Sequence, residues 1–325
     1  MKKRAPRNRT LTCSEDEMNI LSKDLVSVES PSTYEEIENK IIHQDIFDAA
    51  PHLPVGFADL LILDPPYNLP KVYDGILFKE RHDSDYRAWF ASVVDVVKPL
   101  LKANATVYAC SDWKTSTLIA PILEDNFHVR NRITWEREKG RGSSSNWKNS
   151  AEDIWFCTVS RQYTFDVDAV KLKRRVIAPY RTGEGKPKDW QEESEGNFRI
   201  THPSNVWTDI SVPFWSMPEN TDHPTQKPEK LVAKLMLASS NPCDTVFDPF
   251  LGSGTSAVVA RKLGRRFVGV EISRAYCCWA LKRLRMADRV PSIQGYEDGV
   301  FWERNSLVNR RKKKPTTPVR TEKFI

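Results

Sequence analysis

One stretch constrains the fold more than any other, TVFDPFLGSGTSAVVARKLGRRFVGVE at residues 245–271. A short apolar run leads into a glycine-rich turn, a segment with helical spacing follows, and a second apolar run ends at Glu271. This order predicts a strand–turn–helix–strand unit of a parallel sheet. Gly252 and Gly254 allow a ligand to approach the backbone closely, and the N–H groups of the helix that begins at Thr255 face that ligand.

Glu271 indicates what kind of ligand this turn binds. It follows Gly254 by 17 residues, and an acid at about this distance binds ribose hydroxyls in nucleotide-binding α/β folds. An adenosine-bearing cofactor is therefore indicated. Ala257 stands where the dinucleotide fingerprint has its third glycine, and the lysine of a P-loop is missing. From the glycines alone, a purely structural helix-entry turn stays open as an alternative.

The rest of the chain alternates in the same way. Strands are predicted at 58–64, 105–111, 129–137 and 151–160, and helices at 85–101, 115–127 and 223–240, the last entered through Pro228. With 325 residues, 40% of them hydrophobic, the chain suits one large α/β domain with insertions. We expect a doubly wound, mostly parallel Rossmann-like sheet.

Residues 161–222 interrupt this rhythm with clustered charge and scattered Trp and Tyr. The predicted organisation is a flexible arm at 1–35, a catalytic half at 36–160, an insertion at 161–222, a cofactor-binding half at 223–290 and a basic tail at 291–325.

Several classes of protein are excluded by composition. The sequence contains no stretch of eighteen consecutive apolar residues, so no membrane span is predicted. The basic N-terminus lacks the apolar segment of a secretory signal. The six cysteines form no C-x-x-C pair, so we expect a reduced, cytosolic protein without a metal. The net charge is +6, with basic clusters at 171–175 and 309–314. These clusters are either solvated surface or contacts for a polyanion.

A second motif, LILDPPYNLP at residues 61–70, ends an apolar strand in Asp64. Pro65 and Pro66 fix φ and remove two backbone donors, and Tyr67 follows with an aromatic ring. Alone, the tetrapeptide is also compatible with a rigid structural turn.

Three motifs in order, DPPY at 64–67, HPTQKP at 223–228 and DPFLGSG with its following helix from 248, resemble the β class of permuted DNA amino-methyltransferases. This class includes bacterial N6-adenine and N4-cytosine enzymes of restriction–modification type. The resemblance spans residues 40 to 285 and implies S-adenosyl-L-methionine as cofactor, with no metal. If the strands ending at Asp64 and Asp248 are neighbours, catalytic loop and cofactor meet whichever comes first in the chain.

The chemistry of such an enzyme gives the DPPY residues their roles. An exocyclic amine is a poor nucleophile because its lone pair is delocalised into the ring. Asp64 can accept a hydrogen bond from one N–H and the Pro65 carbonyl from the other, with both acceptors held rigid by Pro65 and Pro66. Tyr67 offers a face on which the flipped base stacks, since a base inside a duplex is out of reach.

The cofactor contacts are assigned by resemblance to Asp45, Asp64, Lys227, Asp248, Phe250, Gly252, Ser253, Gly254, Thr255, Glu271 and Ile272. Alternatives stay open for three of them. Asp45 is also a candidate helix N-cap. Lys227 either binds the cofactor carboxylate, anchors a loop or is solvated, and Phe250 packs on the cofactor or in the core.

The first residue of DPPY bears on the substrate. In this family Asp is typical of N6-adenine enzymes, while N4-cytosine enzymes more often carry Ser, so adenine is predicted and N4-cytosine is the alternative. C5-cytosine chemistry needs a cysteine nucleophile, and Cys243 lies outside the catalytic loop. RNA and protein methyltransferases with a related N-P-P-Y loop usually place the cofactor motif first. An inactive DNA-binding subunit usually lacks the acid or the glycines.

DNA recognition is predicted in the insertion, with 139–150 as a loop that closes over DNA. The candidate contacts are Arg141, Arg174, Arg175, Arg181 and Lys186, and solvated loop charges are the alternative for each. The resemblance implies double-stranded DNA as partner. A homodimer and a restriction endonuclease that acts on the same site are further partners in this family. The implied location is the cytoplasm of a bacterium, or of a phage host, at the nucleoid.

Overall fold

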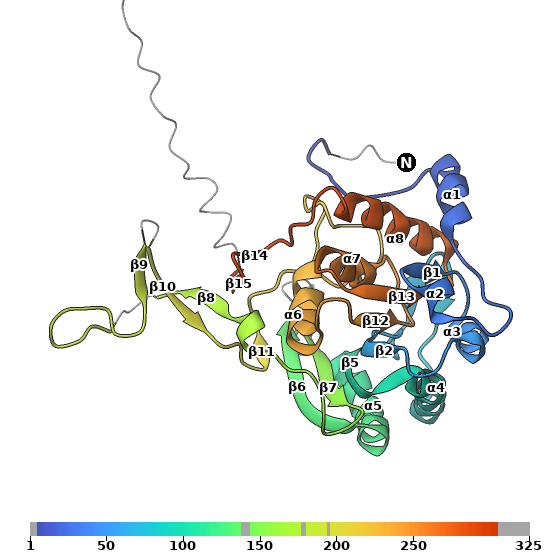
Figure 1. Cartoon of the computed structure of the whole chain (residues 1–325), viewed down its shortest axis with the longest axis horizontal. Coiled ribbons are helices and arrows are strands. Elements are labelled where there is room, and N and C mark those ends of the chain that lie inside the picture. The colour runs from blue at the N-terminus through green and yellow to red at the C-terminus, as the bar shows by residue number, and fades with distance from the viewer. Residues whose placement is uncertain (1–4, 138–143, 177–179, 194–195, 305–325) are drawn as a thin grey trace, which may run out of the picture.

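An eight-stranded sheet forms the centre of the computed structural model (Figure 1), which describes residues 5–137, 144–176, 180–193 and 196–304. Its order is β1-β13-β12-β2-β5-β7-β6-β11. The strands from β1 to β5 run parallel, whereas β7 is antiparallel to both of its neighbours. The bounds are Lys40–Ile42 for β1, Arg266–Val270 for β13, Thr245–Asp248 for β12, Ala58–Leu63 for β2, Leu101–Ser111 for β5, Ala151–Thr158 for β7, His128–Glu136 for β6 and Val206–Trp207 for β11. The predicted doubly wound, mostly parallel sheet is confirmed.

Helices cover both faces of this sheet, and β2 shows how the sequence achieves this. Leu60 and Ile62 share one core cluster with residues of α6, α7 and α8, while Leu61 and Leu63 share another with residues of α3, α4 and α5. Alternate residues of a strand point to opposite faces, so a continuous apolar run suits a strand buried on both sides. The helices are α3 (Ile46–Ala49), α4 (Asp83–Val97), α5 (Trp113–Asn126), α6 (Glu229–Ser239), α7 (Thr255–Lys262) and α8 (Arg274–Ala287).

The helix boundaries follow local signals in the sequence. Helix α4 ends at Val97 because Pro99 follows, and a 3₁₀ turn continues to Leu100. Pro228 is the N-cap of α6, and Gly254, with φ of 83°, is the N-cap of α7. The entries predicted at Pro228 and Thr255 are therefore confirmed. No helix in the described ranges is long and apolar enough to cross a membrane.

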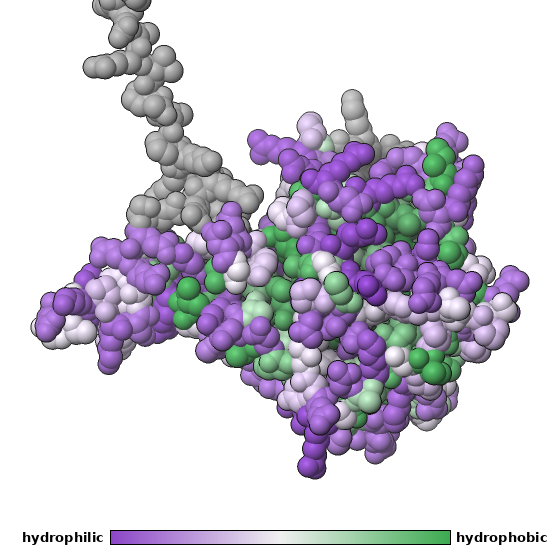
Figure 2. Space-filling model, viewed as in Figure 1, coloured by the Kyte–Doolittle hydropathy of each residue, from purple (hydrophilic) through white to green (hydrophobic). Residues whose placement is uncertain are grey.

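A second sheet projects from the body of the molecule (Figure 1), and hydrophilic residues cover much of its visible face (Figure 2). Its order is β14-β15-β8-β10-β9, with bounds Tyr296–Glu297, Val300–Trp302, Leu172–Arg175, Gly196–Thr201 and Gln191–Glu193. Strand β15 pairs in parallel with β8. The sheet thus combines the predicted insertion with residues 296–302, which the sequence analysis assigned to the tail. Strand β11 of the insertion joins the main sheet instead.

The predicted N-terminal arm also contains regular structure. Helix α1 (Glu15–Leu21) begins with a capping box at Ser14, and α2 spans Tyr34–Ile37. Glu15 pairs with Arg274 at 3.1 Å, and Glu17 with Lys282 at 2.6 Å, so α1 lies against α8. This docking was not predicted, because in the sequence each charge alone resembles a solvated residue.

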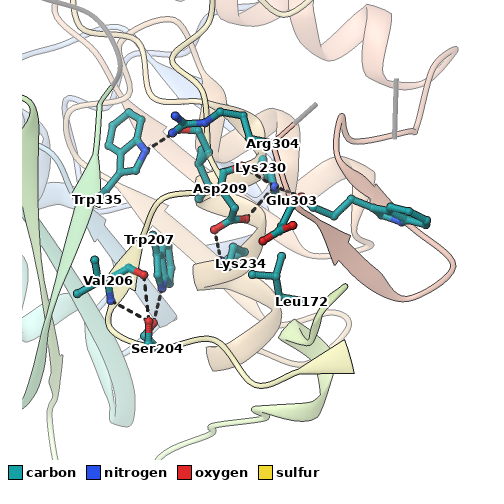
Figure 3. Close-up of polar contacts among 12 residues, drawn as sticks. Trp135, Leu172, Ser204, Val206, Trp207, Asp209, Lys230, Lys234, Glu303 and Arg304 are labelled. Carbon is teal, nitrogen blue, oxygen red and sulfur yellow. Dashed lines mark hydrogen bonds and ion pairs between the residues drawn. The ribbon is translucent and has the colours of Figure 1, made fainter. Parts of the chain in front are cut away.

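A buried acid fastens the projecting sheet to the body (Figure 3). Asp209 lies 2.8 Å from the Lys230 ammonium and 3.2 Å from that of Lys234. Lys230 also donates to the carbonyl of Trp302 in β15. Burial opposes ionisation of Asp209, but the two ammonium groups outweigh it and hold its pKa below the ordinary value. Burial lowers the pKa of Lys234 to about 8 against the attraction of Asp209.

We expect Asp209→Asn to destabilise the fold by about 3–5 kcal/mol, because it leaves two buried ammonium groups without a counter-charge. Chemical denaturation measures this loss. Asp168→Asn is the matched control, since it removes an acid paired with Lys171 at the surface. We expect it to leave the free energy of unfolding nearly unchanged. Equal effects of the two variants would contradict the role of Asp209.

Candidate active site

The site lies where the order of the strands reverses. Strands β12 and β2 are direct neighbours, with Val246 opposite Leu60, while the chain proceeds from β12 to β13 on one side and from β2 to β5 on the other. Ligands of doubly wound sheets bind at the carboxyl ends of strands at this point. A cavity of about 510 Å³ opens there, and both Asp64 and Asp248 line it. The strand neighbourhood expected from the sequence is therefore confirmed.

The DPPY loop is held from several sides. The Pro66 carbonyl accepts a hydrogen bond from Tyr86 at 2.9 Å. The backbone N–H of buried Asn68 donates to the Thr115 hydroxyl at 3.1 Å. The Asn68 side chain donates to the Arg81 carbonyl and accepts the Arg81 N–H. These contacts, added to the two fixed proline φ angles, make the loop rigid.

The ammonium group of Lys227 binds this loop directly. It lies 2.8 Å from each oxygen of Asp64 and 3.0 Å from the Tyr67 hydroxyl. Glu152, at the start of β7, lies 3.2 Å from the same ammonium and forms an ion pair with Arg137 at 2.6 Å. Of the readings that the sequence left open for Lys227, this geometry is that of a loop anchor. A solvated lysine does not fit, because the side chain is only 8% exposed.

The pKa shifts in this cluster have physical causes. Burial raises the pKa of Asp64, although Lys227 opposes the shift. Burial disfavours the charged form of Lys227, but the carboxylates of Asp64 and Glu152 outweigh it, so its pKa lies above the ordinary value. Burial and the same two carboxylates raise the pKa of Tyr67. At neutral pH Lys227 is therefore an ammonium and Tyr67 a neutral donor.

The glycine loop is built for close approach. Gly252 and Gly254 have φ of 53° and 83°, and a Cβ on Gly252 would lie 3.0 Å from the ring of His223. The buried guanidinium of Arg283 donates to the Ser253 carbonyl at 2.9 Å and to the Thr255 hydroxyl at 3.0 Å. The loop is thus fixed from α8, while Gly252 and Ser253 line the cavity.

Glu271 closes the far side of the loop. Its two carboxylate oxygens accept the N–H groups of Gly252 at 2.7 Å and Ser273 at 2.8 Å. Burial raises its pKa to about 7, against these hydrogen bonds. Burial likewise raises the pKa of Asp248 to about 7, although Asp248 accepts from Ser256 and from the N–H of Phe250.

The other predicted cofactor residues also meet at the cavity. Asp45 lines it and also caps α3 by accepting the N–H of Phe47 at 2.8 Å. The N-cap reading is therefore confirmed, and the contact with the cofactor adenine stays a prediction. Phe250 lines it while packing on Trp89, with ring centroids 6.1 Å apart. The wall includes Ser253, Thr255 and Ile272 as well, whereas Gly254 lies behind it against Ala280.

The predicted DNA contacts lie elsewhere. Arg174 and Arg175 are in β8 of the projecting sheet, Arg181 and Lys186 are in the loop that follows, and Arg141 is outside the described residues. Lys186 pairs with Glu184 at 3.1 Å, and Arg174 lies 3.9 Å from Glu303. The Arg181 guanidinium lies over Trp190. Within the described ranges, Arg175 and Arg181 form no ion pair with an acid.

Several residues at the site were missed by the sequence analysis. Glu152 and Arg137 complete the lysine cluster, and Arg283 holds the glycine loop. His223 lines the cavity, and burial lowers its pKa to about 3, so its ring is neutral. The hairpin of β3 (Lys71–Tyr73) and β4 (Ile76–Phe78) forms another wall. Only His223 carried a signal, as part of HPTQKP.

Because the acidic DPPY loop and the glycine loop open into one cavity from neighbouring strands, the chain has the arrangement of a Rossmann-like methyltransferase. It belongs to the DNA methylase family, whose sequence model matches residues 58–282. The resemblance inferred from the three motifs is thereby confirmed.

Individual relatives extend this match. DNA adenine methyltransferase YhdJ of Escherichia coli (strain K12) is 31% identical over 264 residues, which cover 79% of this chain and 86% of YhdJ. Type II methyltransferase M.HpaI of Haemophilus parainfluenzae is 31% identical over 76% of this chain and 74% of its own length.

Solved structures share the fold. The M1.HpyAVI–SAM complex matches with a TM-score of 0.51 and 23% identity, over 75% of this chain and 98% of that chain. The cytosine-N4-specific PvuII DNA methyltransferase matches with a TM-score of 0.55 and 15% identity, over 78% and 92%.

We expect Gly254→Ala to lose more stability than Gly264→Ala. Both glycines have left-handed φ, 83° and 70°, but a Cβ on Gly254 would lie 2.4 Å from the Cβ of Ala280, whereas Gly264 faces open space. Each variant carries a conformational cost of about 1–2 kcal/mol, and overpacking adds about 1–3 kcal/mol at Gly254. Urea denaturation separates the two variants, and equal losses would contradict a packed glycine loop.

Proposed function

We propose that the protein transfers a methyl group from S-adenosyl-L-methionine to the N6 amine of adenine in double-stranded DNA. The observation that carries the proposal is the position of Asp64, which lies on a rigid loop and lines the same cavity as the glycine loop. The relative YhdJ is named a DNA adenine methyltransferase, and the DPPY motif begins with Asp, which favours adenine over the N4-cytosine alternative.

The residues of the cavity fit this cofactor. Gly252 and Ser253 bring the backbone of the glycine loop to the cavity wall, and Glu271 has carboxylate lone pairs for ribose hydroxyls. Asp45, which also lines the cavity, is the proposed contact of the cofactor adenine. Ile46, Ile62, Leu77 and Phe78 provide apolar walls. When bound, S-adenosyl-L-methionine supplies an electrophilic methyl group.

The chain's own residues then prepare the amine. Asp64 accepts one N–H of the amine, and the Pro65 carbonyl accepts the other, which localises the nitrogen lone pair. In the described part of the chain, the Pro65 carbonyl carries no other hydrogen bond. Tyr67 stacks on the flipped base. The methylated amine loses a proton readily, and Asp64, whose pKa is raised by burial, lies in position to accept it.

Sequence recognition falls to the projecting sheet in this proposal. Residues 161–222 supply β8, β9 and β10, and 296–302 supply β14 and β15. Among the predicted contacts, Arg175 and Arg181 have no acidic partner within the described ranges, and they are the candidates for phosphate or guanine contacts. The name of the relative M.HpaI, a type II methyltransferase, supports a cognate restriction endonuclease as partner. A homodimer and a location in the bacterial cytoplasm rest on the family resemblance.

Long-read sequencing with modified-base detection tests the proposal. Plasmid DNA from a methylation-free host that expresses the wild type is expected to carry N6-methyladenine at one short motif, and DNA from the Asp64→Ala host is expected to carry none. N4-methylcytosine at the motif would contradict the assignment of the base. No DNA mark, from a protein that binds S-adenosyl-L-methionine, would contradict the DNA substrate.

Cofactor binding is expected to strengthen as pH rises. Ribose hydroxyls donate to the ionised form of Glu271, whose pKa is about 7, so affinity at pH 6 falls about tenfold below that at pH 8. Titration calorimetry with S-adenosyl-L-methionine measures this dependence. Glu271→Gln removes the titrating group, and we expect its affinity to be weaker and flat across this range. A pH dependence that persists in Glu271→Gln would show that another group is responsible.

A further inference from the structure

Four side chains of alternating charge form a row through the site: Arg137, Glu152, Lys227 and Asp64. The row starts with the 2.6 Å pair of Arg137 and Glu152. The next contact is the ion pair of Glu152 with the Lys227 ammonium at 3.2 Å, and the last is the ion pair of that ammonium with Asp64 at 2.8 Å. Two cations and two anions balance, so the row is neutral as a whole.

Lys227 stands between two cavities. Asp64 lines the cavity that holds the proposed cofactor site, while Arg137 and Glu152 line a second, polar cavity of about 300 Å³. Lys227 lines both. Glu152 therefore reaches Lys227 from the second cavity, and its side chain is 5% exposed.

The acceptor that the reaction needs is already occupied in this arrangement. Both oxygens of Asp64 bind Lys227, and the Tyr67 hydroxyl lies 3.1 Å from one of them. An incoming amine has to compete for these lone pairs. If Lys227 simply moved away, its ammonium would lose its partner inside the protein, which is strongly unfavourable.

Glu152 provides the alternative partner. Its Oε2 lies 3.2 Å from the Lys227 ammonium and 3.2 Å from the Tyr67 hydroxyl. Both donors can therefore exchange Asp64 for Glu152 through small movements. The ion pair with Arg137 holds Glu152 in place and balances its charge.

We propose that Glu152 is a positioning residue that takes the hydrogen bonds of Lys227 and Tyr67 from Asp64 when the target base enters, so that Asp64 accepts the amine. This inference rests on the proposed function for its substrate, but the sharing of Lys227 between two carboxylates is a property of the protein alone. The exchange forms and breaks only hydrogen bonds and ion pairs.

Steady-state kinetics of Glu152→Gln test the exchange, with DNA that contains the motif identified by sequencing. The glutamine keeps the shape of the side chain but not its charge, so Lys227 stays on Asp64. We expect kcat to fall about tenfold to a hundredfold, while KM for S-adenosyl-L-methionine changes by less than about twofold. An unchanged kcat would overturn the proposal.

Asp153→Asn is the matched control for these kinetics. Asp153 is the next acid along β7 and is also largely buried, but it bonds Thr134 and pairs with Arg132 rather than Lys227. We expect its kcat to match that of the wild type. A loss equal to that of Glu152→Gln would assign the effect to general damage to β7 and would also overturn the proposal.

A double-mutant cycle tests the sharing without DNA or cofactor. In Asp64→Asn or in Glu152→Gln, one carboxylate remains for Lys227, whereas the double variant leaves none. We therefore expect the melting temperature of the double variant to fall by clearly more than the sum of the two single shifts. Additive shifts would overturn the sharing of Lys227. If the cycle shows coupling but the wild type methylates no DNA, the proposed function fails while the ion-pair arrangement stands.

Discussion

The buried ammonium group of Lys227 is the interaction on which the site depends. It binds the loop after β2, the start of β7 and, through the backbone of its own segment, the entry of α6. Removing one charge from such a cluster leaves another uncompensated in a region that water hardly reaches. The position of Asp64 is therefore set by three distant segments of the chain and not by the two prolines alone.

The same helix also links the site to the projecting sheet. Lys227 immediately precedes α6, and Lys230, in the first turn, binds Asp209 and the carbonyl of Trp302 in β15. One end of α6 thus contacts both the catalytic loop and the root of the second sheet. The glycine loop is anchored here too, because the Thr255 hydroxyl donates to the Lys227 carbonyl at 3.0 Å.

Much of the site could be predicted from the sequence because its signals are local. The glycines before α7, the acid after β13 and the DPPY loop after β2 each follow a strand within a few residues, and parallel strands bring these ends to one edge. Glu152 escaped prediction for a topological reason. Strand β7 is antiparallel to β5, so its beginning, and not its end, lies at the active-site edge, with Asp153 opposite Ser111. If all strands are assumed to be parallel, Glu152 at the start of β7 is placed at the edge of the sheet opposite the active site.

Long-range pairing explains the other misses. Strand β15 joins β8 across more than a hundred residues, and Arg283 reads in the sequence as one charge among several on an amphipathic helix. Neither contact has a local signal.

A crystal structure with S-adenosylhomocysteine and duplex DNA that contains the target motif is the most direct test of this arrangement. We expect the adenine outside the helix, its amine about 3 Å from Asp64 and the Pro65 carbonyl, and Lys227 bound to Glu152. An adenine still stacked in the duplex, or an amine remote from Asp64 while Lys227 bridges both of its oxygens, would contradict it.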